Sequence, residues 1–130
     1  MLNKFFLYDN LLQKTKIYYK QRKYHLALNM VNKEISMKLP ISKQKKADAY
    51  ELRGNIKTQL NFHLDSINDF NKAIRLDPKN AALFFYRGMA LCVLDDKDGA
   101  LKDFNQLIKL EPNNNSAKEM SQYLRDCLKD

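Results

Sequence analysis

The stretch NDFNKAIRLDPKN, residues 68–80, recurs as KDFNQLIKLEPNN at residues 102–114, which is 34 positions further along the chain. Seven of the thirteen positions are identical. When the comparison is extended, residues 47–80 and residues 81–114 form two consecutive units of 34 residues each. A period of this length is typical of repeat proteins, in which each unit is one supersecondary element.

The apolar residues of each unit follow the spacing of a helix rather than that of a strand. They recur at intervals of three and four residues, which places them on one helical face. They are Ile67, Phe70, Ala73 and Ile74 in the unit 47–80 and Leu101, Phe104, Leu107 and Ile108 in the unit 81–114. Asn61, Asp95 and Asp96 stand midway in the units, where their side chains favour a turn and can cap the next helix. Each unit is therefore predicted to be a helix, a tight turn and a second helix.

Both units also carry residues that end one helix and begin the next. Pro78 and Pro112 are expected to end the second helix, because proline disfavours a helical conformation in the residue before it and donates no backbone hydrogen bond. Asn80 and Asn114 are expected to cap the helix that follows.

Gly54 and Gly88 lie in the middle of predicted helices, where glycine costs up to about 1 kcal/mol relative to alanine. This cost predicts that the two helices of a unit approach each other closely at these residues. The repeat also predicts an ion pair between the helices of each unit. The pairs join Arg53 to Asp69 and Arg87 to Asp103.

The order of these residues resembles the tetratricopeptide repeat family. The resemblance rests on the Arg-Gly pair, the later Asp-Phe pair, the closing Leu-Asp-Pro or Leu-Glu-Pro, and an aromatic residue at Tyr50 and Phe84. It covers residues 47–114 and implies an all-α fold, a right-handed α-solenoid of stacked helix pairs. Lys57 departs from the family pattern, in which a large apolar residue is usual.

A more divergent unit precedes the two clear repeats. It is predicted to begin near Tyr8 and to include about five extra residues around LPISKQKK, a long basic connection. Residues 115–130 are predicted to form one more helix, because the end of a solenoid needs a polar-backed cap. We expect a single domain over residues 1–130 with seven helices. It comprises repeats at 8–46, 47–80 and 81–114 and a capping helix at 115–130.

The resemblance implies that the first helix of each unit lines a concave groove. The groove positions are Asp9, Leu12, Lys16, Tyr19 and Lys20 in the first repeat, Asp48, Glu51, Asn55, Thr58 and Gln59 in the second, and Ala82, Phe85, Met89, Cys92 and Val93 in the third. The third row is apolar throughout, and exposed apolar patches commonly mark binding sites. We therefore expect a peptide or helix of a protein partner to contact Phe85, Met89 and Val93. Polar anchoring of that segment is expected at Lys16, Tyr19, Lys20 and Asn55.

Two alternatives for the apolar row remain open. The capping helix can cover part of it, at Phe85 and Cys92, or the row can join two copies of the chain in a homodimer.

An enzymatic function finds no support in the sequence. It contains no glycine-rich phosphate loop, no Ser-His-Asp arrangement and no cluster of metal ligands. His25 and His63 lie in or beside the predicted turns and are expected to be solvated. The sequence therefore predicts no catalytic residues, no metal and no cofactor, and it indicates a non-enzymatic interaction scaffold or adaptor.

Many relatives bind the acidic tails of heat-shock chaperones through a carboxylate clamp of Lys, Asn, Asn, Lys and Arg. The clamp positions in this chain are Leu12, Lys16, Leu52, Ala82 and Tyr86. Only one of the five is basic, so a role as a chaperone-tail adaptor is disfavoured.

An alternative function follows from the uneven charge. Residues 1–46 hold eleven Lys and Arg against two acids, a local charge of +9, whereas the whole chain carries +8. This basic end is suited to RNA or another polyanion, with aromatic stacking on Tyr18, Tyr19 and Tyr24. The candidate residues are Lys14, Lys20, Arg22, Lys23, Lys43, Lys45 and Lys46, the last three on the long connection.

The expected location is the cytoplasm, with targeting to an organelle left open. No stretch approaches the roughly 18 consecutive apolar residues that a membrane-spanning helix requires. Cys92 and Cys127 lack the close spacing of a zinc site and are expected to be reduced thiols.

Overall fold

A computed structural model describes residues 3–129 of the chain. This part contains seven α-helices and no strand, as the periodicity predicted. The helices are α1 (Lys4–Lys20), α2 (Tyr24–Ser36), α3 (Lys43–Gln59), α4 (His63–Leu76), α5 (Ala81–Val93), α6 (Lys97–Leu110) and α7 (Asn115–Leu128).

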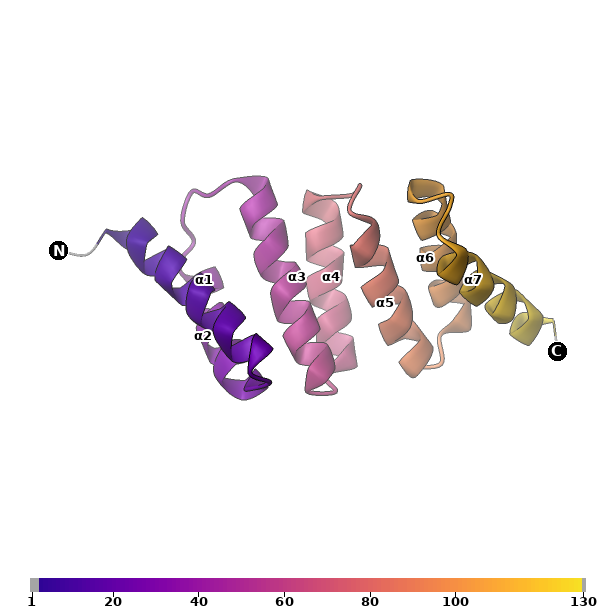
Figure 1. The fold of residues 1–130 in the computed structure, drawn as a ribbon, viewed down its shortest axis with the longest axis horizontal. Helices are drawn as coiled ribbons and strands as arrows, with labels where there is room; N and C mark the ends of the chain where they lie inside the picture. The colour runs from indigo at the N-terminus through magenta and orange to yellow at the C-terminus, as the bar shows by residue number, and fades with distance from the viewer. Residues whose placement is uncertain (1–2, 130) are drawn as a thin grey trace.

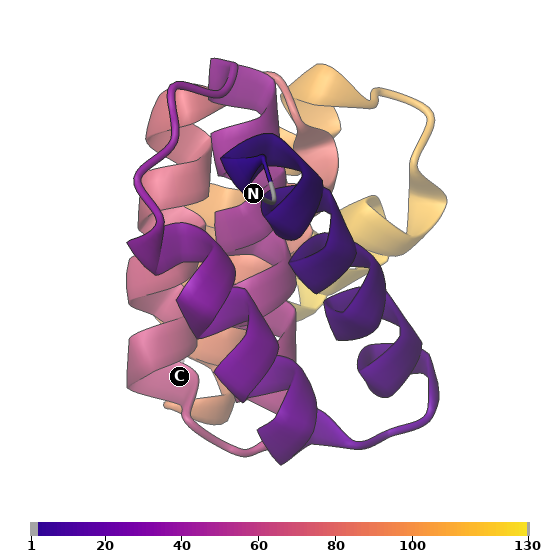
Figure 2. The same cartoon turned by 90° about the vertical axis from the view of Figure 1, so that its left-hand side faces the viewer.

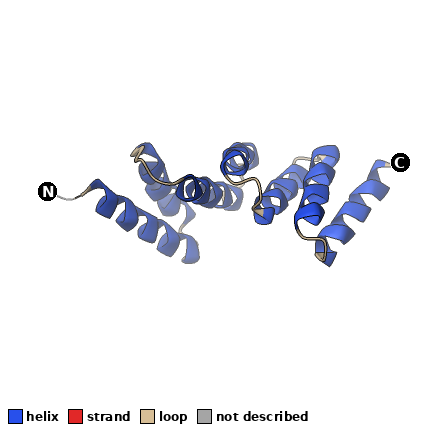
Figure 3. Cartoon of the chain, turned by 90° about the horizontal axis from the view of Figure 1, so that it is seen from above, coloured by secondary structure: helices blue, strands red, loops and turns tan. Residues whose placement is uncertain are grey.

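The helices succeed one another along the long axis of the molecule in chain order, so the two termini lie at opposite ends (Figure 1). Each helix packs on the one before it, and α3 also contacts α5. The view from above shows the same succession of helices joined by short loops (Figure 3). The predicted α-solenoid is therefore confirmed. No helix in the described residues has the length and apolar character needed to cross a membrane.

The predicted turns inside the helix pairs are present, and each contains a residue in the left-handed conformation. The φ angle is 65° at Asn61 and 62° at Asp95, and Arg22 has a φ of 60° between α1 and α2. Asp96 caps α6 as expected, because its side chain accepts a hydrogen bond from the backbone N–H of Gly99 at 2.9 Å. Asn61 does not cap α4, which begins after Phe62 without a side-chain cap.

The boundaries between helix pairs agree with the sequence prediction. Helices α4 and α6 end at Leu76 and Leu110, two residues before the prolines. Asn80 then accepts a hydrogen bond from the backbone N–H of Ala82 at 3.2 Å, and Asn114 accepts one from Ala117 at 3.0 Å. Both asparagines are therefore N-caps.

Close helix packing explains the two mid-helix glycines. A Cβ atom at Gly54 would lie 2.6 Å from Cε1 of Phe70, and one at Gly88 would lie 3.1 Å from Cε2 of Phe104. Both phenylalanine rings are fully buried. Each glycine thus admits the aromatic ring of the second helix of its own pair.

The two predicted ion pairs are present and bidentate. Arg53 donates to both carboxylate oxygens of Asp69, at 2.9 and 2.7 Å, and Arg87 makes the same two contacts with Asp103. The aspartates are almost completely buried, at 1% and 3% exposed. These pairs therefore belong to the interior between the helices rather than to the surface.

The first helix pair differs from the prediction at both ends. Helix α1 begins at Lys4 instead of near Tyr8, because the side chain of Asn3 caps it by accepting from the backbone N–H of Phe5. The connection after α2 covers only residues 37–42, and its one basic residue is Lys38. The end view shows α1 beside α2 and the connection rising to the start of α3 (Figure 2).

The placement of Lys43, Lys45 and Lys46 on a connection was wrong. They form the first turn of α3, because Ser42 accepts a hydrogen bond from the backbone N–H of Lys45 at 3.1 Å and so starts the helix there. Most of the extra length of the first repeat is therefore taken up by an additional turn at the start of α3.

Candidate functional site

The apolar row on α5 is exposed to solvent. Phe85, Met89 and Val93 are 41%, 38% and 61% exposed, and they recur at intervals of four residues on one face of the helix. The ring of Phe85 packs edge-on against Phe104 of α6, with the ring centres 6.2 Å apart, which fixes its orientation. Phe85 is therefore anchored at one edge, and Met89 and Val93 extend the exposed apolar surface along the helix.

The capping helix covers only part of this row. Helix α7 joins the core through Ala117 and Leu124, and half-buried Cys92 packs against the same cluster. Burial raises the pKa of the Cys92 thiol. Phe85 keeps its 41% exposure, so the capping helix leaves much of Phe85 open, whereas Cys92 packs against the cluster that α7 joins.

A hollow of about 290 Å³ lies between α1 and α3 and brings two of the predicted anchors together. Lys16 lines it from α1 and Asn55 from α3. The other lining residues are Tyr8, Leu12, Lys45, Asp48, Ala49, Glu51 and Leu52. The first helices of the first two pairs therefore both line this hollow.

The residues that line this hollow carry charges of both signs. Burial raises the pKa of Glu51, and the nearby carboxylates of Asp48 and Asp77 raise it further. Asn80 donates a hydrogen bond to Glu51 at 3.3 Å, which opposes the shift. The hollow therefore presents Lys16 on the α1 wall, and Lys45 together with Asp48 and Glu51 on the α3 wall.

Tyr19 and Lys20 do not line the hollow. Tyr19 is half-buried and packs edge-on against Tyr24 at 5.8 Å between ring centres, and burial raises the pKa of its hydroxyl. Tyr18 and Tyr24 are also half-buried against the core of the first repeat. Lys20 is exposed at the last residue of α1.

The basic candidates are all exposed, but the fold divides them. Lys20, Arg22 and Lys23 lie at the turn between α1 and α2, whereas the lysines of the first turn of α3 lie at the opposite end of the helices (Figures 1 and 2). Lys14 lies on α1 between the two groups. The structure therefore does not gather them into one continuous patch.

The two histidines differ from each other. His25 is exposed, as expected. His63 is half-buried, and its Nδ1 atom has no hydrogen-bond partner within residues 3–129, so the prediction that it is solvated was wrong. It is the first residue of α4, immediately after the turn at Asn61. In the same residues no group of three His, Cys, Asp or Glu is arranged to hold a metal ion.

Sequence reasoning missed one buried acidic residue. Glu34 on α2 is 2% exposed and is one turn away from buried Val31. Its spacing from Val31 and Ala27 is that of a core position, and this was the available signal.

Comparison with known proteins agrees with this architecture. Models of the tetratricopeptide repeat match residues 47–80 and residues 81–114. No curated protein sequence matches the chain significantly.

Several solved structures have a similar fold. The TPR domain of Arabidopsis OM64 superimposes with a TM-score of 0.80 at 26% identity, over 92% of this chain and 95% of that one. The first TPR of Spaghetti (RPAP3), bound to the HSP90 peptide SRMEEVD, gives 0.82 at 24% identity, over 95% and 94% of the two chains. The TPR2B domain of yeast Sti1 in its Hsp70 complex gives 0.77 at 16% identity, over 92% and 96%.

Proposed function

Because this chain belongs to the tetratricopeptide repeat family, we propose that it is a non-enzymatic interaction scaffold that binds a peptide or helical segment of a protein partner in its groove. The observation that carries this proposal is the exposed apolar row of Phe85, Met89 and Val93 on α5. An exposed apolar patch on a folded domain commonly marks an interaction site.

The polar part of the groove supports the same function. Lys16 and Asn55 flank the hollow between α1 and α3, next to Asp48 and Glu51. A partner segment that places apolar side chains on α5 would therefore present polar groups of both signs to this hollow.

Two structural neighbours support peptide binding as the general mode of action. They are RPAP3 domains solved with the peptides SRMEEVD and SGPTIEEVD, which both end in acidic residues. In this chain the corresponding clamp positions hold four uncharged residues and Lys16 alone. We therefore propose a partner segment that is anchored by apolar side chains rather than by an acidic terminus.

The decisive experiment is an affinity capture from the native cell with identification of partners by mass spectrometry. The test variant is Met89→Asp with Val93→Asp, and the matched control is Leu64→Asp. Leu64 is 70% exposed and lies on α4, a second helix, outside the row. We expect partners of the wild type to be retained by the control and lost by the double variant, with both variants folded by circular dichroism. Equal capture by all three proteins would exclude the groove.

Two further proposals concern assembly and location. Gel filtration over a range of concentrations tests the homodimer through the Phe85 row, which the double variant should convert to a monomer. We place the protein in the cytoplasm, where its two cysteines, both free, remain reduced.

The RNA alternative receives less support, because the exposed Lys and Arg side chains lie at two opposite ends of the helices. Binding to RNA would weaken steeply as salt rises.

A further inference from the structure

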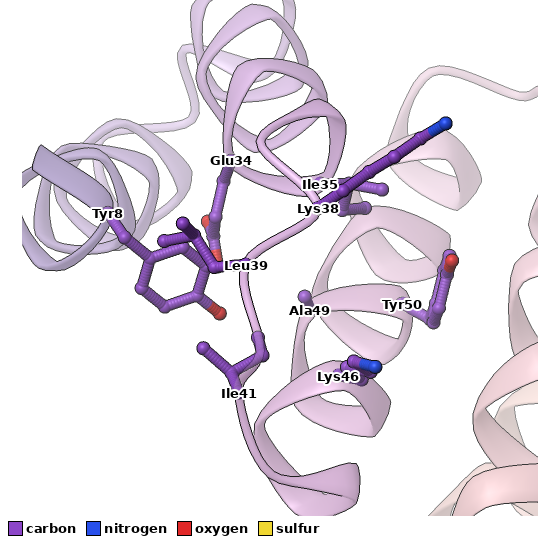
Figure 4. A pocket seen from close by; sticks show the side chains of 9 residues that line it. All are labelled: Tyr8, Glu34, Ile35, Lys38, Leu39, Ile41, Lys46, Ala49 and Tyr50. Carbon is purple, nitrogen blue, oxygen red and sulfur yellow. The ribbon is translucent and has the colours of Figure 1, made fainter. Parts of the chain in front are cut away.

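A small cavity lies beside the first connection, away from the apolar row on α5. Its volume is about 220 Å³, and it is enclosed by α1, α2, residues 37–42 and α3 (Figure 4). Ile35, Leu39 and Ile41 supply apolar walls. Pockets for drug-sized ligands have volumes of roughly 300–1,000 Å³, so this cavity suits a shorter aliphatic chain.

The cavity is lined by a buried carboxylate. Glu34 lines it at 2% exposure, and neither of its carboxylate oxygens has a hydrogen-bond partner within residues 3–129. Burial raises the pKa of Glu34, an effect opposed by the hydroxyl of Tyr8 and by the charge of Lys16. Tyr8 is near enough to act on the carboxylate, but it does not meet either oxygen in hydrogen-bond geometry.

The other repeats show that the fold does not require an acid here. The first repeat is 39 residues long and the others 34, so Glu34 and Tyr8 have equivalents in both later repeats. The equivalents are Ala73 and Leu107 for Glu34 and Ala47 and Ala81 for Tyr8, all buried. An uncompensated buried carboxylate is costly, whereas an apolar residue at this position packs well. The pair in the first repeat therefore points to a ligand rather than to packing.

The mouth of the cavity has the opposite charge. Lys38 and Lys46 line it and are exposed, and their ammonium groups lie away from the Glu34 carboxylate (Figure 4). A simple amine would be repelled by these lysines as it approached, and a simple carboxylate would meet Glu34 inside. A molecule with an ammonium group at one end and an anionic group at the other complements both.

We propose that this cavity binds a short aliphatic zwitterion, with its ammonium group paired to Glu34 and its carboxylate paired to Lys38 and Lys46. The apolar walls enclose the methylene chain between the two charges. This site is separate from Met89 and Val93, so failure of the peptide-binding proposal does not affect it.

The test is an NMR titration of the whole ¹⁵N-labelled chain with 6-aminohexanoate, compared with hexylamine and hexanoate. We expect 6-aminohexanoate to shift amide signals around the cavity, with a dissociation constant on the order of 1 mM, as suits so small a ligand. The two singly charged compounds should bind at least about tenfold more weakly, since each lacks one charge-assisted hydrogen bond. Binding of hexylamine or hexanoate as tight as that of the zwitterion would overturn the proposal.

Two variants locate the site. Glu34→Gln should weaken 6-aminohexanoate binding at least about tenfold, whereas Glu119→Gln, at an exposed position on α7, should leave it unchanged. The double variant Lys38→Met with Lys46→Met keeps the carboxylate of Glu34. It should therefore bind 6-aminohexanoate no more tightly than hexylamine. Unchanged affinity in Glu34→Gln, or an unchanged preference in the lysine variant, would each contradict the proposed site.

Discussion

The ammonium group of Lys57 lies 3.1 Å from Oδ2 of Asp69, so the buried carboxylate of Asp69 is paired with two cations. Lys57 occupies the position at which the family usually has a large apolar residue, and the next repeat has Leu91 there. Leu91 packs against the apolar core instead. The departure from the family pattern thus adds a second partner to the Arg53–Asp69 pair.

This difference predicts unequal effects of removing the two arginines. Arg87→Ala should lower the free energy of unfolding by about 3 kcal/mol, because it leaves the buried carboxylate of Asp103 without its cation. Arg53→Ala should cost about 1 kcal/mol less, since Lys57 still neutralises Asp69. Urea denaturation of both variants measures the difference. Equal losses would show that Lys57 contributes nothing to the pair.

The two mid-helix glycines should also differ. In Gly54→Ala the new methyl group would meet the ring of Phe70 at 2.6 Å, and that ring is fully buried. We expect a loss of about 2 kcal/mol from overpacking. Gly88→Ala brings a milder contact of 3.1 Å with Phe104, which the gain in helix propensity offsets to within about 1 kcal/mol. Thermal unfolding of the two variants compares them, and a larger loss for Gly88→Ala would contradict this explanation.

The cap of the last helix offers a local test. Asn114→Ala removes the hydrogen bond from the backbone N–H of Ala117 and should destabilise the chain by about 1 kcal/mol. Asn113→Ala changes an exposed residue next to it and serves as the control. Hydrogen exchange should show the loss concentrated in α7. Identical stability of the two variants would mean that Asn114 does not act as a cap in solution.

Glu34 predicts a pH dependence of stability. Its pKa is raised in the folded protein, so between the ordinary value for glutamate and the raised value the folded state binds more protons than the unfolded state. Stability should therefore fall as pH rises through this range. Tyr8 and Lys16 from α1 are the groups that act on its carboxyl group. Lys38, Lys46 and Tyr50 also line the cavity.

Replacing this acid isolates its effect. Glu34→Gln should be more stable than the wild type by about 1 kcal/mol at pH 7, because burial disfavours the ionised form of Glu34 and glutamine carries no charge. The advantage should shrink toward pH 4, where the wild-type carboxyl group is protonated. Urea denaturation at pH 4, 5.5 and 7 measures it. An advantage that stays constant with pH would show that Glu34 is not the titrating group.

Much of the fold was predictable because its signals are local. Asn80 and Asn114 cap helices that start within three residues of them, and the turns at Asn61 and Asp95 depend on their own backbone conformation. The pairing of Arg53 with Asp69 was also predictable, since the 34-residue period places the same two residue types at the same spacing twice.

The candidate sites were predicted less completely. The helical period placed Phe85, Met89 and Val93 on one face, and the fold leaves that face open. Tyr19 was assigned to the groove on the same reasoning, yet it packs against Tyr24. A period identifies residues that share a face, but the neighbouring helix determines whether that face is covered.

The sequence by itself determined the repeat, the helix pairs and the way they stack. These follow from local conformational preferences that recur in two consecutive units of 34 residues. Only the tertiary structure decided which side chains are enclosed without a partner. The cavity around Glu34 is formed by two helices, a six-residue connection and the additional turn of α3, which meet only after folding. Burial depends on what all of these elements exclude from water together, and no spacing within one segment contains that information.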